Sequence, residues 1–181
     1  STSRRQRQMC IRDSTIAANA GNAEAQYDLG VCYRRGEGVQ QDFSKAIEWY
    51  EKAINQDHTG AMVNYAILLD NGIGVEKDHK KAFELYKRAA EADNYQAQFC
   101  LEDMYFQGRY VPQDYSEAIR WFTLAAQKGE PDSIFHIAIC YAEGLGVERD
   151  IEQAIRLFYQ AADLGWQPAI EVIQQNRIAR P

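Results

Sequence analysis

A 36-residue period runs through this sequence without insertion or deletion, and it constrains the fold more than any other feature. Five positions hold the same residue in all four copies of the period. They are Gly36, Gly72, Gly108 and Gly144; Val39, Val75, Val111 and Val147; Asp42, Asp78, Asp114 and Asp150; Ala46, Ala82, Ala118 and Ala154; and Ala53, Ala89, Ala125 and Ala161. A fixed period of this length is typical of stacked repeat architectures. We therefore interpret the chain as an array of one repeated unit.

Each unit is predicted to form two helices. In the first copy, Asn22 is an expected N-cap for a helix that runs to about Arg35, and Gly36 supplies a left-handed residue that ends it. Asp42 is the expected N-cap of the second helix, which ends near Asp57. The apolar stripes at helical spacing are Ala25, Leu29 and Tyr33 in the first helix and Ala46, Trp49, Tyr50 and Ala53 in the second.

A small residue recurs in the first helix of three copies, as Gly30, Ala66 and Ala138. We expect it to let the paired helix approach closely, while larger neighbours fill the groove beside it. One helix pair cannot cover both of its apolar faces, so the units are predicted to stack into an all-α solenoid.

The pattern resembles the Sel1-like repeats, relatives of the tetratricopeptide repeat, over residues 15 to about 173. The first copy carries the resemblance through Ala25, Leu29, Gly30, Tyr33, Gly36, Gly38, Val39, Asp42, Ala46, Trp49, Tyr50 and Ala53. The resemblance implies a right-handed superhelix of antiparallel helix pairs. It also implies a non-catalytic scaffold or adaptor that presents a concave surface to other proteins.

The third copy departs from the pattern at two positions. Glu102 occupies the small Gly/Ala position, and Tyr110 replaces the second glycine of the loop. A carboxylate at the helix contact must reach solvent or find a partner. A tyrosine with positive φ costs about 1–2 kcal/mol. Local adjustment of one helix pair and a binding specialisation both remain open interpretations.

The period also predicts the organisation of the chain. Residues 1–14 do not continue the phase, and we expect them to be non-native or disordered. The period begins in the middle of a unit at residues 15–21, so we expect the chain to be an N-terminally truncated fragment. The expected segments that follow are 15–21, the end of a preceding repeat helix; 22–57, 58–93, 94–129 and 130–165, the four repeats; and 166–181, a C-terminal capping helix.

Charge argues against nucleic acid and anionic lipid as partners. The formal net charge is −6. Residues 1–14 hold four arginines and one aspartate, so the rest of the chain has 16 basic against 25 acidic residues, a net charge of −9. No stretch approaches 18 consecutive apolar residues, so no membrane span is expected.

Sequence motifs for cofactors and metals are weak. The Gly-x-Gly loops are each followed by an aspartate at the next helix start, where a phosphate would need bare amides, so we interpret them as structural turns. The four cysteines and three histidines show no metal-ligand spacing. We therefore expect no metal and no cofactor.

The inner surface of the array is a stronger indication of function than these motifs. By analogy with tetratricopeptide repeats, the first helix of each pair lines the concave face. The period places a row of apolar residues on this face, which we call the ladder residues, with charged residues at its rim. The predicted partner-binding residues are Tyr27, Val31, Val63, Ile67, Phe99, Asp103, Phe135 and Ile139, with Arg34, Arg35, Asp70 and Glu143 at the rim. The alternative is that the apolar members only pack helix against helix.

The sequence therefore predicts a non-catalytic adaptor that binds a peptide or protein. One alternative is a hydrolase-like, penicillin-binding activity, which is suggested for a cysteine-rich branch of the family. A convergent acid/base cluster with perturbed pKa values would favour that alternative. The other alternative is a structural spacer to a further domain, which a groove of short polar side chains would favour.

Overall fold

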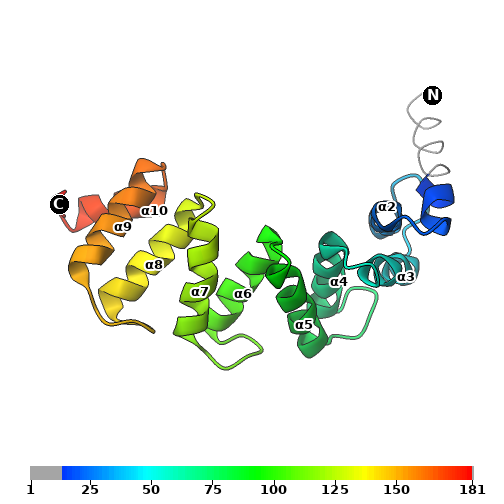
Figure 1. Ribbon diagram of the computed structural model, residues 1–181, viewed down its shortest axis with the longest axis horizontal. Coiled ribbons are helices and arrows are strands. Elements are labelled where there is room, and N and C mark those ends of the chain that lie inside the picture. The colour runs from blue at the N-terminus through cyan, green and yellow to red at the C-terminus, as the bar shows by residue number, and fades with distance from the viewer. Residues whose placement is uncertain (1–13, 181) are drawn as a thin grey trace. The chain divides into compact units, whose positions relative to one another are not determined.

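The computed structural model describes residues 14–180, and their secondary structure is helical with no strand. Residues 14–19 form a short helical segment ahead of the labelled helices (Figure 1). The prediction for residues 1–14 falls, apart from residue 14, outside the described residues. The labelled helices are α2 (Ala23–Arg35), α3 (Phe43–Ile54), α4 (Thr59–Asn71), α5 (His79–Glu91), α6 (Tyr95–Gln107), α7 (Tyr115–Ala126), α8 (Pro131–Glu143), α9 (Ile151–Asp163) and α10 (Gln167–Gln175).

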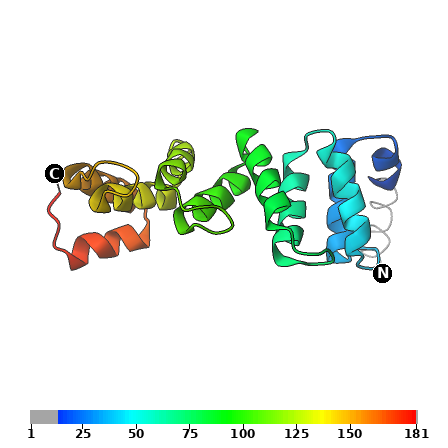
Figure 2. The ribbon, with the colours of Figure 1, turned by 90° about the horizontal axis from the view of Figure 1, so that it is seen from below.

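The described chain divides into two compact units, residues 14–94 and 95–180. In the first unit α2 packs against α3, α3 against α4, and α4 against α5. In the second unit α6 packs against α7, α7 against α8, α8 against α9, and α9 against α10, the orange-red helix of Figure 2. Each unit is thus a stack of helix pairs.

Aspartate N-caps begin the second helix of every pair, as predicted. The Asp42 side chain accepts a hydrogen bond from the Lys45 amide at 3.0 Å, and Asp150 accepts one from the Gln153 amide at 2.9 Å. These carboxylates satisfy amides that have no partner inside the helix. The same role is taken by Asp78 and Asp114.

Left-handed residues end the first helices, also as predicted. Gly36 has φ +71° and its amide bonds to the carbonyl of Cys32. The second loop position is left-handed too, at φ +74° for Gly38. In the third repeat this position is Tyr110 with φ +64°, so the tyrosine adopts the glycine conformation and carries its strain.

Small residues sit where paired helices cross. The alanine positions of the second helices are 0–1% exposed in all four repeats. A Cβ placed on Gly30 would lie 2.6 Å from the ring of Tyr50, so the close approach of α2 and α3 depends on that glycine. This confirms the packing role predicted for the small residue at this repeat position.

Candidate functional site

The first helices of the pairs, α2 and α4 in one unit and α6 and α8 in the other, carry the predicted binding residues. We call their surface the first-helix face, and each unit is considered by itself. None of the described helices has the length and apolar character needed to cross a membrane.

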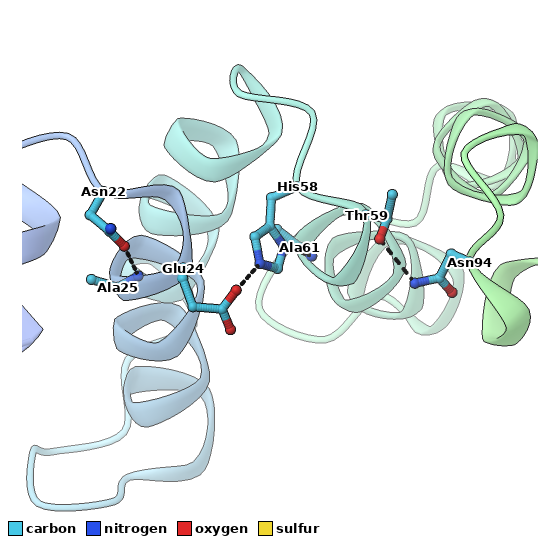
Figure 3. A network of polar contacts seen from close by, with 7 residues as sticks. All are labelled: Asn22, Glu24, Ala25, His58, Thr59, Ala61 and Asn94. Carbon is cyan, nitrogen blue, oxygen red and sulfur yellow. Dashed lines mark hydrogen bonds and ion pairs between the residues drawn. The ribbon is translucent and has the colours of Figure 1, made fainter.

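Side chains at the N-termini of α2 and α4 form a polar network (Figure 3). Asn22 caps α2 by accepting from the Ala25 amide at 2.8 Å. His58 caps α4 through Nδ1, which accepts from the Ala61 amide at 3.1 Å, and its Nε2 lies 3.1 Å from Oε2 of Glu24. Because Nδ1 accepts a hydrogen bond, the ring proton is on Nε2, which donates a hydrogen bond to Glu24.

The same network continues at the far end of the first unit. Nδ2 of Asn94 donates to Oγ1 of Thr59 at 3.1 Å (Figure 3). Within the first unit, the contact between His58 and Glu24 therefore joins the N-terminal ends of α4 and α2, and Asn94 binds the N-terminal end of α4.

The predicted apolar residues of the first unit differ in exposure. Tyr27 is half-buried and stacks on His58, with ring centroids 4.5 Å apart. Val31 and Ile67 are also partly exposed. Val63 is 1% exposed and belongs to the core, so as placed it offers no surface to a partner.

The predicted rim residues of the first unit mostly have partners within the chain. Arg35 is exposed and lies 3.5 Å from Glu37, while Arg34 is half-buried. Asp70 lies 2.8 Å from Nδ1 of His79. The rim charges are therefore largely engaged before any partner binds.

In the second unit the predicted residues divide between surface and core. Phe99 on α6 is 47% exposed. Asp103 pairs with Arg109. Phe135 and Ile139 on α8 are half-buried and pack against core residues, as the alternative packing interpretation expects. Glu143 is exposed.

A small pocket of about 70 Å³ opens beside Phe99. Its walls include Phe106 of α6 and Phe122 of α7, and its carboxyl groups belong to Glu102, Asp103 and Asp132. We call it the Glu102 pocket. Its volume is well below the roughly 300–1,000 Å³ of a small-molecule site, so it suits one side-chain head rather than a whole ligand.

Glu102 does not reach solvent. It is 2% exposed, and its Oε1 has no hydrogen-bond partner within the described residues. Burial raises the pKa of Glu102 to about 8, and the nearby carboxylates of Asp132 and Glu130 add to the rise while a hydrogen bond from Ser133 opposes it. Glu102 is therefore mostly protonated at pH 7.

His136 on α8 completes the pocket. Its ring stacks on Phe122 with centroids 5.0 Å apart and an interplanar angle of 2°. Its Nδ1 lies 3.2 Å from Oδ1 of Asp132. An acid/base cluster thus exists here, although the sequence signalled it only through the misfit of Glu102 in a small-residue position.

The residues that sequence reasoning missed come from positions that vary between repeats. The period aligns His136 with Asp28, Asn64 and Cys100, and it aligns Phe106 with Arg34, Asp70 and Ala142. A search for repeated residues cannot find a site built from the differences between repeats.

The cysteines within the described residues, Cys32, Cys100 and Cys140, are not in disulfide bonds. Cys10 lies outside the described residues. Within the described part of the chain, no group of three or more histidines, cysteines and acidic residues is placed to hold a metal ion.

Comparison with known proteins places the chain in a family. The family model for the Sel1 repeat matches residues 23–58, 59–94, 100–130 and 131–166. The chain therefore belongs to the Sel1 repeat family, and the predicted all-α array of helix pairs is confirmed. The match is shortest in the third repeat, the one that holds Glu102 and Tyr110.

Two solved structures show the same fold. One is c5321, a protective antigen of uropathogenic Escherichia coli, with a TM-score of 0.85 and 28% identity over 96% of this chain and 38% of that one. The other is a Sel1 repeat protein from Oxalobacter formigenes, with a TM-score of 0.77 and 31% identity over 92% of this chain and 68% of that one.

More distant relatives include cysteine rich protein B of Helicobacter pylori, with a TM-score of 0.52 and 25% identity over 73% of this chain and 95% of that one. A curated relative is the rat DAP3-binding cell death enhancer 1, 35% identical over 46 residues, which are 25% of this chain. The match covers only 9% of the rat protein's length.

Proposed function

We propose that the chain is a non-catalytic interaction scaffold that binds a peptide or protein segment on the first-helix face. The observation that carries the proposal is Phe99, a large aromatic side chain that is 47% exposed on α6. The side chain also lines the Glu102 pocket. Aromatic residues are enriched at protein interfaces because they bury much apolar area with few torsions to fix.

The proposed scaffold presents a binding surface that is already ordered before the partner arrives. Within each unit, the stacked helix pairs hold the first helices in place before binding, so little conformational entropy of the protein is lost when a partner docks. The rat relative is named for binding a protein, DAP3, which supports a protein-binding role for a Sel1-type segment. An aromatic-lined pocket also disfavours the spacer alternative, for which short polar side chains are expected.

Hydrolysis is a second candidate, favoured by Glu102 beside the His136–Asp132 pair. A carboxyl group that is protonated near neutral pH can act as a general acid. Ser133, which hydrogen-bonds to Glu102, is 3% exposed and does not line the pocket, so water would be the nucleophile. Turnover of a chromogenic β-lactam that is lost in Glu102→Gln would support this candidate.

A peptide-display selection on the full chain tests the scaffold proposal. We expect bound peptides to slow hydrogen exchange in α6 and α8, and Phe99→Ala to weaken their binding at least tenfold. Ile151→Ala is the matched control, because Ile151 is similarly exposed, at 43%, but lies on a second helix, α9.

Three outcomes separate the possibilities. Weakening by Phe99→Ala alone supports the first-helix face as the binding surface. Equal weakening by both variants, or protection confined to the second helices, contradicts it. A selection that yields no binding peptide also counts against the proposal.

A further inference from the structure

The Glu102 pocket is a specialisation of the third repeat. The position of Glu102 is held by Gly30, Ala66 and Ala138 in the other repeats, where small side chains let the helices pack. A carboxyl group buried there to 2% exposure, with one oxygen lacking a partner among the described residues, is destabilising unless something uses it. This makes a ligand the simplest reason for its presence.

The pocket combines aromatic walls with three carboxyl groups, and Glu102 carries the most deeply buried of the three. Phe99 is half-exposed, while Phe106 and Phe122 meet edge to face with centroids 5.8 Å apart. A ligand that reaches Glu102 therefore passes aromatic side chains. An aliphatic stem with a cationic head matches this arrangement, because phenyl faces and carboxylates both attract cations.

The carboxyl groups favour a compact cation over a planar one. Each already has one oxygen engaged within the chain: Glu102 by Ser133, Asp103 by Arg109, and Asp132 by His136. An arginine fork needs both oxygens of one carboxylate for its bidentate geometry. A lysine ammonium directs three donors from a single point and can reach single oxygens on different residues.

We propose that the Glu102 pocket binds the lysine side chain of a peptide that lies on the first-helix face. This inference rests on the proposed function, since the lysine belongs to the bound segment. The acidic balance of the array, −9 outside residues 1–14, favours basic segments by the same charge complementarity.

Lysine binding is coupled to release of a proton from Glu102. Several titratable and charged groups surround Glu102. Tyr95 and Asp103 lie on α6, Glu130 directly precedes α8, and Asp132 and His136 lie on α8. Arg109 pairs with Asp103. On α7 the pocket is faced by the phenyl ring of Phe122. An inserted ammonium lowers the pKa of Glu102 from about 8, so the proton leaves to solvent as the ion pair forms.

The test uses Nα-acetyl-lysine amide as the probe, titrated into the full chain and followed through backbone amide shifts. The norleucine and arginine analogues are the comparison ligands, because norleucine keeps the stem without the charge. We expect saturable shifts in α6 and α8 with lysine, at least tenfold weaker binding with arginine, and none with norleucine.

Glu102→Ala is the informative variant, since it restores the residue that this position holds in the second and fourth repeats. It is expected to retain the helical circular dichroism of the parent and to lose lysine binding at least tenfold. Glu148→Ala is the control, because Glu148 is exposed in a loop of the same unit and forms no part of the pocket.

A pH series with the lysine probe provides the second readout. From about pH 6 to pH 8 the affinity of the parent should rise by up to tenfold per unit and then level off. Glu102→Gln should flatten the rise of affinity with pH. The same pH series on His136→Gln shows how much of the rise depends on the imidazole of His136.

Equal binding of lysine and norleucine, unchanged affinity in Glu102→Ala, or no saturable shift with lysine would each overturn the inference. Peptides selected in the display experiment that bind Glu102→Ala as tightly as the parent would overturn it while leaving the proposed function standing. If Phe99→Ala loses peptide binding while the lysine probe causes no shifts in any of the proteins, the inference is likewise overturned and the proposed function stands.

Discussion

Nε2 of His58 lies 3.1 Å from Oε2 of Glu24, which joins the N-terminus of α4 to that of α2, one period earlier in the chain (Figure 3). The same imidazole caps its own helix through Nδ1 and stacks on Tyr27. One side chain therefore serves as helix cap and as a contact between successive repeats, so its removal is expected to have separable effects.

His58→Ala is expected to be less stable than His58→Asn by about 1 kcal/mol, because asparagine retains an N-cap acceptor and alanine does not. Asparagine occupies the equivalent position as Asn22 and caps α2 there. Both variants lose the stack on Tyr27, so both should be less stable than the parent. Urea unfolding followed by circular dichroism measures the difference.

Glu24→Gln serves as the control for the hydrogen bond between His58 and Glu24. The Glu24 side chain is largely exposed, so the pair contributes little and a change below about 0.5 kcal/mol is expected. Equal stability of the alanine and asparagine variants would contradict the capping role.

Tyr110→Gly is expected to stabilise the second unit by about 0.5–1 kcal/mol. The tyrosine has φ +64°, and relief of a strain of about 1–2 kcal/mol is partly offset by the greater entropy that glycine loses on folding. Thermal unfolding of the variant beside the parent measures the gain.

Gly146→Ala, at the same loop position of the next repeat, should act in the opposite direction. Gly146 has φ +68°, and an added Cβ would lie 2.7 Å from the backbone of Tyr115 and Ser116, which cannot move aside cheaply. Destabilisation by Tyr110→Gly, or tolerance of Gly146→Ala, would show that this loop position does not require glycine-like geometry.

The period was sufficient to predict the parts of the fold that every repeat shares. The caps at Asn22 and Asp42 and the turn at Gly36 follow from local backbone chemistry, which repeats when the residues repeat. The packing role of Gly30 followed for the same reason.

Depth of burial could not be predicted from the period. Val63 and Phe99 occupy the same repeat position, yet Val63 is in the core and Phe99 is half-exposed. The position decides which way a side chain leaves its helix, whereas its burial depends on its size and on neighbours that differ between repeats. The Glu102 pocket is set by such neighbours on three helices.

The stability of the second unit is expected to fall as pH rises from about 5 to 8. The folded pKa of Glu102 is about 8 against an ordinary value of 4.5, so between these values the folded state binds the proton that the unfolded state releases. Stability is therefore highest below the lower value and decreases by up to about 1.4 kcal/mol per pH unit.

Glu102→Gln removes this titration and provides the comparison. The difference in unfolding free energy between parent and variant, measured by urea titration from about pH 6 to 8, should shift steadily in favour of the variant. A difference that does not vary with pH would show that Glu102 ionises normally in the folded chain.

Phe99→Ala and Val63→Ala should separate surface from core among the predicted ladder residues. Phe99 is half-exposed, so its truncation should change the unfolding free energy by less than about 1 kcal/mol. Val63 is almost fully buried, and its truncation should cost roughly 2 kcal/mol by leaving a cavity. Urea unfolding of the two variants decides this: if Phe99→Ala were the costlier change, Phe99 would be a core residue and the first-helix face would lose its aromatic anchor.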